Sequence, residues 1–203
     1  MYKRQIPQPL DPALARALAA YPLVDVLVHG WSHVSHAPAG AKHSEYPQER
    51  PLAAVASELA AARERVAALL PGHALPMFVP PWNRIAADAA ERLPAAGFRA
   101  LSTFARTRAA TRTAGLLRLD THWDPIDWHG GRGLRDEAEL IDALTRLIEE
   151  PETQGARLQP LGLLTHHAVH DAWIDRFVDT VLTTLAASPV VRFTRIAEHV
   201  PLA

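Results

Sequence analysis

Leu23–His33 reads LVDVLVHGWSH, and the fold assignment of this chain begins from it. Its first part, Leu23–Val28, is a run of apolar and β-branched residues that predicts a buried strand. The polar residues His29-Gly30-Trp31-Ser32-His33 follow at once, where that strand ends. Side chains of this kind at the carboxyl end of a strand are typical of active sites in α/β barrels and open α/β sheets.

The same order, an apolar strand followed by a polar motif, recurs three more times. In parallel sheets the carboxyl ends of the strands meet at one edge, which brings such motifs together. Four of them in one chain indicate an enzyme. The three further motifs are PPWNR at Pro80–Arg84 after Met77–Val79, DPIDW at Asp124–Trp128 after Leu116–Leu119, and THH at Thr165–His167 after Leu161–Leu164.

Helical patterns alternate with these strands along the chain. This alternation implies an α/β fold with a parallel sheet and right-handed crossovers. No linker rich in glycine or serine interrupts it, so residues 1–203 are expected to form a single domain. Helices are predicted over Ala13–Ala20, Pro51–Leu70, Arg84–Leu93, Asp136–Glu150 and Ala172–Ala186, with a short one at the carboxyl end, and further strands over Phe98–Thr103 and Val190–Phe193.

The composition excludes several classes of function. A chain of 203 residues with 48% hydrophobic and 21% charged residues is of the ordinary soluble, globular kind. A formal net charge of −1 provides no general attraction for nucleic acid, which is not an expected partner. No apolar run approaches the roughly 20 residues that a membrane span requires. The absence of cysteine excludes disulfides, thiolate nucleophiles and cysteine-bound zinc.

Histidine is the main compositional excess. Neutral imidazoles four residues apart, as at His29 and His33, can bind one divalent ion. Taken alone, this motif more often represents two loop histidines bonded to the backbone. Six of the eleven histidines form two clusters, at His29, His33 and His36 and at His166, His167 and His170.

His166 lies just after a predicted strand, where an imidazole can act as a general acid or base near neutral pH. The cluster of three is alternatively a second metal site, although packing of His170 against the following helix is the simpler interpretation. Asp127 could hold an imidazole in one tautomer if the fold brings it to His166. The local sequence fits a turn aspartate after Pro125 equally well.

Aromatic residues and a long loop accompany these motifs. Trp82 and Trp128 each adjoin a polar motif, where tryptophan can stack on sugar rings or exclude water, although it is more often a core residue. The loop Gly30–Arg50 is long enough to favour a functional role. Within it, Lys42, Glu45 and Arg50 predict surface ion pairs or a lid clamp.

Taken together and in this order, the motifs resemble those of the polysaccharide deacetylase superfamily (NodB homology, carbohydrate esterase family 4). His29-x-x-x-His33 matches the metal-binding H-x-x-x-H of that family. Asp124-x-x-Asp127-Trp128 matches its D-x-x-D-W, and Leu164-x-His166 matches its L-x-H. Each motif alone is weak, but the ordered set is specific and covers the chain from about residue 23 to residue 171.

The resemblance implies an irregular (β/α) barrel that deacetylates an N-acetylated sugar with the help of a divalent metal ion, zinc by preference. His29 and His33 would hold the ion, and an aspartate of the family would be the third ligand. The ion would polarise the acetamide carbonyl and acidify the attacking water.

The resemblance also assigns roles to the other motifs. His166 would protonate the leaving amine, with Asp127 tuning it. The backbone N–H of Trp82 would help to bind the oxyanion. Trp128 and Leu164 would shape the pocket for the acetyl group.

Two departures from the family pattern stand out. The family has an arginine where this chain has Val79, and Arg84, five residues later, is the candidate replacement at the substrate. The Asp-Asp pair that supplies the family's catalytic base and third metal ligand is absent. The alternative is therefore a non-catalytic glycan-binding relative, and a third, weaker one is a hydrolase of another amide or ester.

The amino terminus offers an explanation for the missing pair. Met1–Gln5 matches the translation of a transposon end used in sequencing libraries, GTG-TAT-AAG-AGA-CAG, although a genuine polar terminus fits as well. An artefact there would mean that the natural chain begins upstream, that the barrel lacks its first strand, and that these 203 residues are inactive. We expect a cytoplasmic location, with the question of a leader peptide left open.

Overall fold

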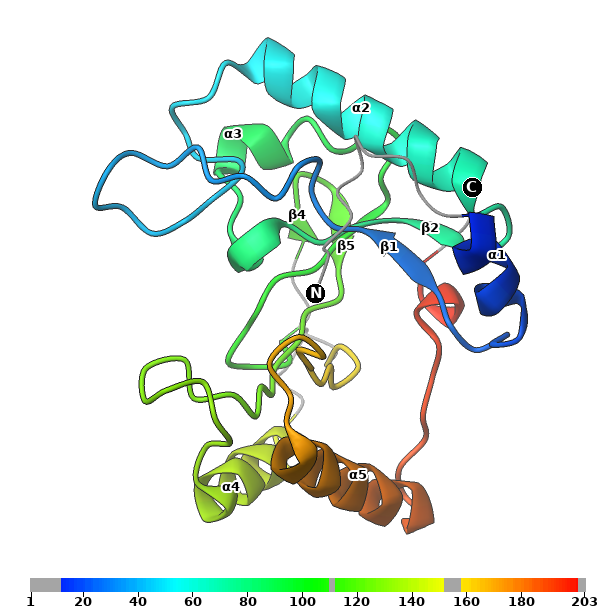
Figure 1. Cartoon of the computed structure of the whole chain (residues 1–203), viewed down its shortest axis with the longest axis vertical. Coiled ribbons are helices and arrows are strands. Elements are labelled where there is room, and N and C mark those ends of the chain that lie inside the picture. Colours follow the sequence, from blue (N-terminus) through cyan, green and yellow to red (C-terminus); the bar gives the residue numbers. More distant parts are fainter. Residues whose placement is uncertain (1–11, 110–111, 152–157, 201–203) are drawn as a thin grey trace. The chain divides into compact units, whose positions relative to one another are not determined.

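The computed structural model describes residues 12–109, 112–151 and 158–200, so Met1–Gln5 lies outside the described residues (Figure 1). The chain divides into two compact units. The first, here called the sheet unit, contains the described residues 12–103, 112–119 and 195–200. The second, the helical unit, contains residues 104–109, 120–151 and 158–194. The expectation of a single domain stays a prediction.

The sheet unit is built on a mixed sheet whose strands are ordered β1-β2-β3-β5-β4 (Figure 1). The first four strands in that order run parallel, and β4 pairs antiparallel with β5. The parallel α/β sheet is confirmed. A barrel is not, because the sheet formed by the described residues is open, with β1 and β4 as its two edges. The strands are β1 (Val26–Val28), β2 (Ala74–Phe78), β3 (Ala100–Leu101), β4 (Arg112–Thr113) and β5 (Leu116–Arg118).

Helix α2 (Leu52–Leu69) packs its apolar face on this sheet (Figure 1). Its buried residues recur at helical spacing and join one cluster with Val28 and Phe78 of the sheet. The ring of Phe78 meets that of Phe98 edge to face at 5.3 Å. The buried residues of α2 are Val55, Leu59, Ala62 and Val66.

The remaining helices of the sheet unit are short. They are α1 (Pro12–Ala19), α3 (Ala87–Ala90) and the 3-10 turns η1 (Pro81–Asn83) and η2 (Ile196–Glu198). The helix predicted over Arg84–Leu93 is wrong at its start. Arg84 and Ala86 are extended, because Ile85 pairs with Tyr46 and the N–H of Ala86 donates to the carbonyl of Tyr46.

The helical unit is organised by two long helices, α4 (Glu137–Ile148) and α5 (Ala172–Ala187), as predicted (Figure 1). Asp136 and Asp171 cap them by accepting backbone N–H groups of their first turns. The ring of Trp123 stacks on Phe177 of α5 at 6.2 Å, and its indole N–H donates to the carbonyl of Leu140 at 3.0 Å. The core of this unit contains Leu140, Leu144, Leu147, Ile174, Val178 and Val181.

The strand predicted over Val190–Phe193 is wrong. The segment after α5 is irregular, and the side chains of Val190 and Phe193 are 87% and 56% exposed. No backbone ladder or apolar layer among the described residues covers it. An apolar run alone therefore did not specify a strand.

The strand predicted over Leu161–Leu164 is reduced to one bridge, between Leu163 and Trp123. Gly162 donates its N–H to Nδ1 of His122 at 3.1 Å and accepts the N–H of His122 at 2.7 Å. A Cβ at position 162 would lie 2.4 Å from the carbonyl oxygen of Asp120. The close approach that only glycine permits thus aligns the segment that leads to His166.

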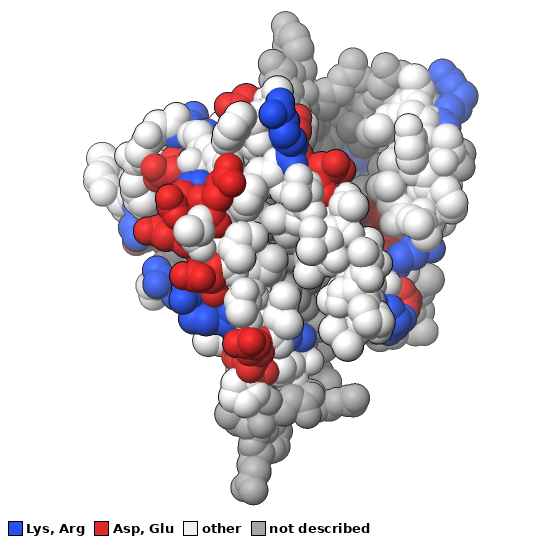
Figure 2. All heavy atoms as spheres, turned by 90° about the horizontal axis from the view of Figure 1, so that it is seen from below, with Lys and Arg blue, Asp and Glu red and all other residues white. Residues whose placement is uncertain are grey.

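No helix in the described part of the chain is long and apolar enough to cross a membrane. Figure 2 shows a face on which uncharged side chains separate small groups of acidic and basic ones. Among the described residues drawn there, no continuous basic surface is formed.

Replacing Gly162 by alanine is expected to lower the free energy of unfolding by about 2 kcal/mol, because the methyl group must displace backbone. Urea unfolding of the variant measures this loss. Gly133→Ala is the matched control, since nothing lies within 4 Å of a Cβ there. Equal stability of the two variants would contradict the close approach.

A second prediction concerns pH. Burial lowers the pKa of His122, whose charged neighbours are Asp120, Arg108 and Glu150. The unfolded chain therefore takes up the proton near pH 6.5, while the native chain remains neutral to lower pH. We expect stability to be fully present above that pH and to fall below it, by up to about 1.4 kcal/mol per pH unit.

The control for this pH effect is His122→Asn, whose amide oxygen can still accept the N–H of Gly162 without titrating. Unfolding free energies of both proteins between pH 7.5 and 5 separate this residue from the other histidines. An identical pH dependence in the two proteins would rule out His122 as the source.

Candidate active site

The first motif places two imidazoles side by side after β1. Nδ1 of His29 lies 3.0 Å from the carbonyl oxygen of Val79, which follows β2. The ring centroids of His29 and His33 are 5.1 Å apart. His33 has a φ of +55°, so the loop turns sharply there. The carboxyl ends of β1 and β2 thus meet at the histidine pair, as the sequence predicted.

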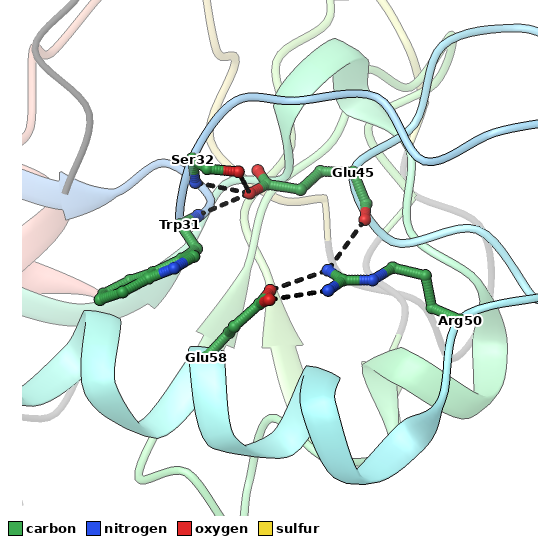
Figure 3. A network of polar contacts seen from close by, with 5 residues as sticks. All are labelled: Trp31, Ser32, Glu45, Arg50 and Glu58. Carbon is green, nitrogen blue, oxygen red and sulfur yellow. Dashed lines mark hydrogen bonds and ion pairs between the residues drawn. The ribbon is translucent and has the colours of Figure 1, made fainter. Parts of the chain in front are cut away.

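Glu45 fixes the loop that carries the pair (Figure 3). Its side chain is fully buried, and Oε1 accepts the N–H groups of Trp31 and Ser32 at 3.1 and 2.6 Å and the Ser32 hydroxyl at 3.0 Å. Gly30, with a φ of +71°, lies so close that a Cβ would stand 2.1 Å from Oε2 of Glu45. The expected surface ion pair is therefore wrong for Glu45, and a role as a clamp of the loop is what the structure gives it.

Arg50 ties the end of the loop to α2 (Figure 3). Its guanidinium binds both carboxylate oxygens of Glu58 at 2.7 Å and also donates to the carbonyl of Glu45 at 3.3 Å. The hydrogen bonds that its guanidinium donates to Glu58 raise the pKa of Arg50. This bidentate pair holds the backbone of Glu45 from the side opposite to its carboxylate.

Trp82 brings the second motif to the histidine loop. It has a φ of +56° within the turn after β2, and its ring lies 4.4 Å from that of His33 and 5.5 Å from that of His43. The turn is closed by the N–H groups of Asn83 and Arg84 rather than by that of Trp82. Trp82 is thus half-buried beside two imidazoles, and its oxyanion role stays a prediction.

Arg84 contacts the backbone of the histidine loop. Its guanidinium donates to the carbonyl of His43 at 3.2 Å and lines a cavity of about 550 Å³ within the sheet unit. Ser44, Asn83 and Arg118 also line that cavity, whereas His29 and His33 do not. This arrangement does not test whether Arg84 takes the place of the family's arginine at the substrate.

The third and fourth motifs meet in the helical unit. Nε2 of His166 lies 3.0 Å from Oδ2 of Asp124, and the indole N–H of Trp128 donates to the same oxygen at 2.9 Å. The rings of Trp128 and His166 meet edge to face at 4.7 Å. Burial alone would raise the pKa of Asp124, but hydrogen bonds from His166, Trp128 and the N–H of Ile126 outweigh it and lower the pKa.

Asp127 does not occupy the predicted place beside His166. Its Oδ1 accepts the N–H groups of His129 and Gly130 at 3.0 and 2.8 Å, and these bonds, that of Gly130 foremost, lower its pKa. It is the turn aspartate of the alternative interpretation, and Asp124 is the carboxylate at the imidazole. The D-x-x-D spacing offers both residues, and only the turn geometry distinguishes them.

Leu164 anchors the fourth motif. Its N–H donates to the carbonyl of Trp123 at 2.8 Å, two residues before His166. The predicted role of its side chain in an acetyl pocket is not tested by this contact.

The histidine pair fits a divalent ion in the type of its donors. The bond of His29 Nδ1 to a backbone carbonyl is the arrangement that orients metal-binding imidazoles. A complete site needs at least a third protein ligand. Among the described residues no group of three His, Asp or Glu side chains is arranged to hold a metal, and Oε2 of Glu45, although buried and without a hydrogen bond, does not complete one.

Comparison with known proteins identifies the fold class. No protein-family model and no curated protein matches the chain. Among solved structures, that of a "putative polysaccharide deacetylase" from Mycobacterium smegmatis superposes with a TM-score of 0.61 over 93% of this chain, at 17% sequence identity. The chain spans 66% of the length of that protein. The chain thus shares the fold of that protein, in agreement with the resemblance of its motifs.

Truncating Glu45 to alanine is expected to lower the free energy of unfolding by about 3 kcal/mol, because two backbone N–H groups lose their acceptor. Urea denaturation measures the loss. Glu49→Ala, an exposed carboxylate of the same loop, should change it by less than about 0.5 kcal/mol. A neutral Glu45→Ala would show that the clamp is dispensable.

Proposed function

We propose that this chain is a hydrolase of the deacetylase class that cleaves the acetamide of an N-acetylated sugar with the help of a divalent ion. The observation that carries the proposal is the Asp124–His166 pair beside Trp128. It supplies an oriented imidazole next to a partly exposed indole, in a fold shared with a protein described as a polysaccharide deacetylase.

The acid–base role of His166 follows from its hydrogen bond. An ionised carboxylate only accepts hydrogen bonds, so Nε2 of His166 carries the proton and donates to Asp124, which fixes the tautomer of the ring. Nδ1 is then the nitrogen that remains for a substrate. As an imidazolium it can protonate the amine that leaves when the acetamide breaks, while Asp124 stabilises the positive charge.

Trp128 supports a carbohydrate as the substrate class. Its side chain is 45% exposed although its indole N–H is bound to Asp124, so one part of the ring is fixed and another faces solvent. Aromatic rings held in this way are suited to pack against the apolar face of a sugar.

His29 and His33 are the two residues proposed to hold the divalent ion. Zinc is the ion that suits two imidazole ligands best. Bound there, the ion would polarise the acetamide carbonyl and acidify the attacking water. Cytoplasmic location and the upstream start of the chain stay predictions.

A non-catalytic glycan-binding relative is the second candidate. The described residues offer two rather than three ligands for a metal, and the sequence lacks an Asp-Asp pair. Such a protein would retain Trp128 and the glycan surface without turnover.

We expect the full-length gene product that contains this chain to release acetate from N-acetylated oligosaccharides. Asp124→Asn should lower kcat by about 100-fold, because the imidazole loses its charged partner. Asp127→Asn should change kcat by less than about threefold. Acetate release with purified variants measures both effects.

Chelation followed by addition of zinc tests the role of the ion in the same assay. Activity should be lost and then restored, and His29→Ala should abolish the recovery. Glycan binding without any acetate release, with or without zinc, would favour the non-catalytic relative. Equal losses from the two aspartate variants would remove the argument for Asp124.

A further inference from the structure

His170 is a buried histidine that the proposed chemistry does not use. Its side chain is 9% exposed and lies at the end of a turn that begins at His166. The N–H groups of Val169 and His170 both donate to the carbonyl of His166, at 2.7 and 3.2 Å. The turn therefore folds His170 back over the backbone of His166.

The two ring nitrogens of His170 have different partners. The backbone N–H of His166 donates to Nε2 of His170 at 3.2 Å, so Nε2 must carry a lone pair. The neutral ring then bears its proton on Nδ1, which lies 2.9 Å from Oδ1 of Asp175. Asp175 stands in the first turn of α5, whose amino terminus is capped by Asp171.

We propose that His170 is a positioning residue for His166. It connects the capped end of α5, through Asp175, to the backbone N–H of His166, and Asp124 holds the ring of His166 at its other end. His166 is thus held at two points, its backbone N–H and the Nε2 of its ring. This inference rests on the proposed function for its catalytic meaning, but its geometry is independent of any substrate.

The three clustered histidines have different surroundings. His166 faces Asp124, His170 supports the backbone of His166, and His167 is exposed. Because both ring nitrogens of His170 are engaged by Asp175 and the His166 N–H, the ring has no nitrogen for a metal shared with its neighbours. The alternative of a metal cluster at these residues therefore does not fit the observed bonds.

The positioning role matters because proton transfer depends on the orientation of the acid. A displacement of about 1 Å at a reacting group can lower a rate by about 100-fold. A neutral Nε2 accepts the N–H of His166, whereas a protonated one would face that donor with another donor. Asp175 is the charged group in contact with His170 and selects the tautomer that accepts.

The experiment compares three variants. His170→Phe keeps a planar ring of similar size but removes the acceptor. His170→Gln places an amide oxygen near the position of Nε2 and can still accept the N–H. His167→Phe is the matched control in the same turn, since His167 is exposed.

The first readout is the nitrogen NMR spectrum of the histidine rings in the wild-type protein without substrate or metal. Neutral His170 should show the Nδ1–H tautomer, and His166 the Nε2–H tautomer. The His166 signals should persist in His170→Gln and broaden or shift in His170→Phe. An Nε2–H tautomer for His170 would overturn the proposal whether or not the protein is an enzyme.

The second readout is deacetylation by the zinc-loaded full-length gene product. His170→Phe should lower kcat at least about tenfold with little change in KM, and His170→Gln should recover most of it. Wild-type kcat in His170→Phe, or equal losses in both His170 variants, would overturn the positioning role. Absence of deacetylation in the wild-type protein would instead count against the proposed function, and the tautomer measurement would still decide the role of His170.

Discussion

A carboxylate removed from water must be surrounded by hydrogen-bond donors, and this requirement organises the candidate site in each unit. In the sheet unit, Glu45 is fully buried and gathers the N–H groups of Trp31 and Ser32. In the helical unit, Asp124 gathers the ring of His166 and the indole of Trp128. The loops after the strands are irregular and lack the hydrogen bonds of a helix or sheet. The hydrogen bonds to these carboxylates therefore hold the loops in one conformation.

Both carboxylate centres depend on a close approach of the backbone. Gly30 leaves room for the carboxylate of Glu45, and Gly162 lets the segment before His166 lie against Asp120. Gly30 lies within the first motif, just after β1, and Gly162 lies three residues before the fourth motif. The tight packing and the site are therefore two consequences of the same local geometry: a side chain at either position would displace the groups that hold the functional loop.

The sequence predicted the long helices, in which apolar residues recur over several turns. It misjudged segments whose structure depends on pairing with residues far away in the sequence. Helices α2, α4 and α5 agree with their predicted spans within a few residues, because a stripe of apolar residues is a local signal, and aspartate caps add a second one for α4 and α5. Val190–Phe193 looked like a strand, but pairing requires a neighbouring backbone that no local pattern announces. The barrel expected from the resemblance is not formed by the described strands, which end in two open edges.

At the candidate site, the structure brings together several of the segments that the motifs singled out, but with other partners than the motifs indicated for some residues. The D-x-x-D-W motif offers two carboxylates as partners for His166. Asp127 instead accepts the backbone N–H groups of His129 and Gly130 in a turn. The sequence around Glu45 fits a surface ion pair or a lid clamp, and nothing in it indicates burial of the carboxylate. Histidine in excess does not imply metal binding, since the rings of His73, His122 and His170 each lie at a backbone polar group. The ring of His166 instead pairs with the carboxylate of Asp124 beside the partly exposed indole of Trp128, and this combination is the reason for proposing it as the acid.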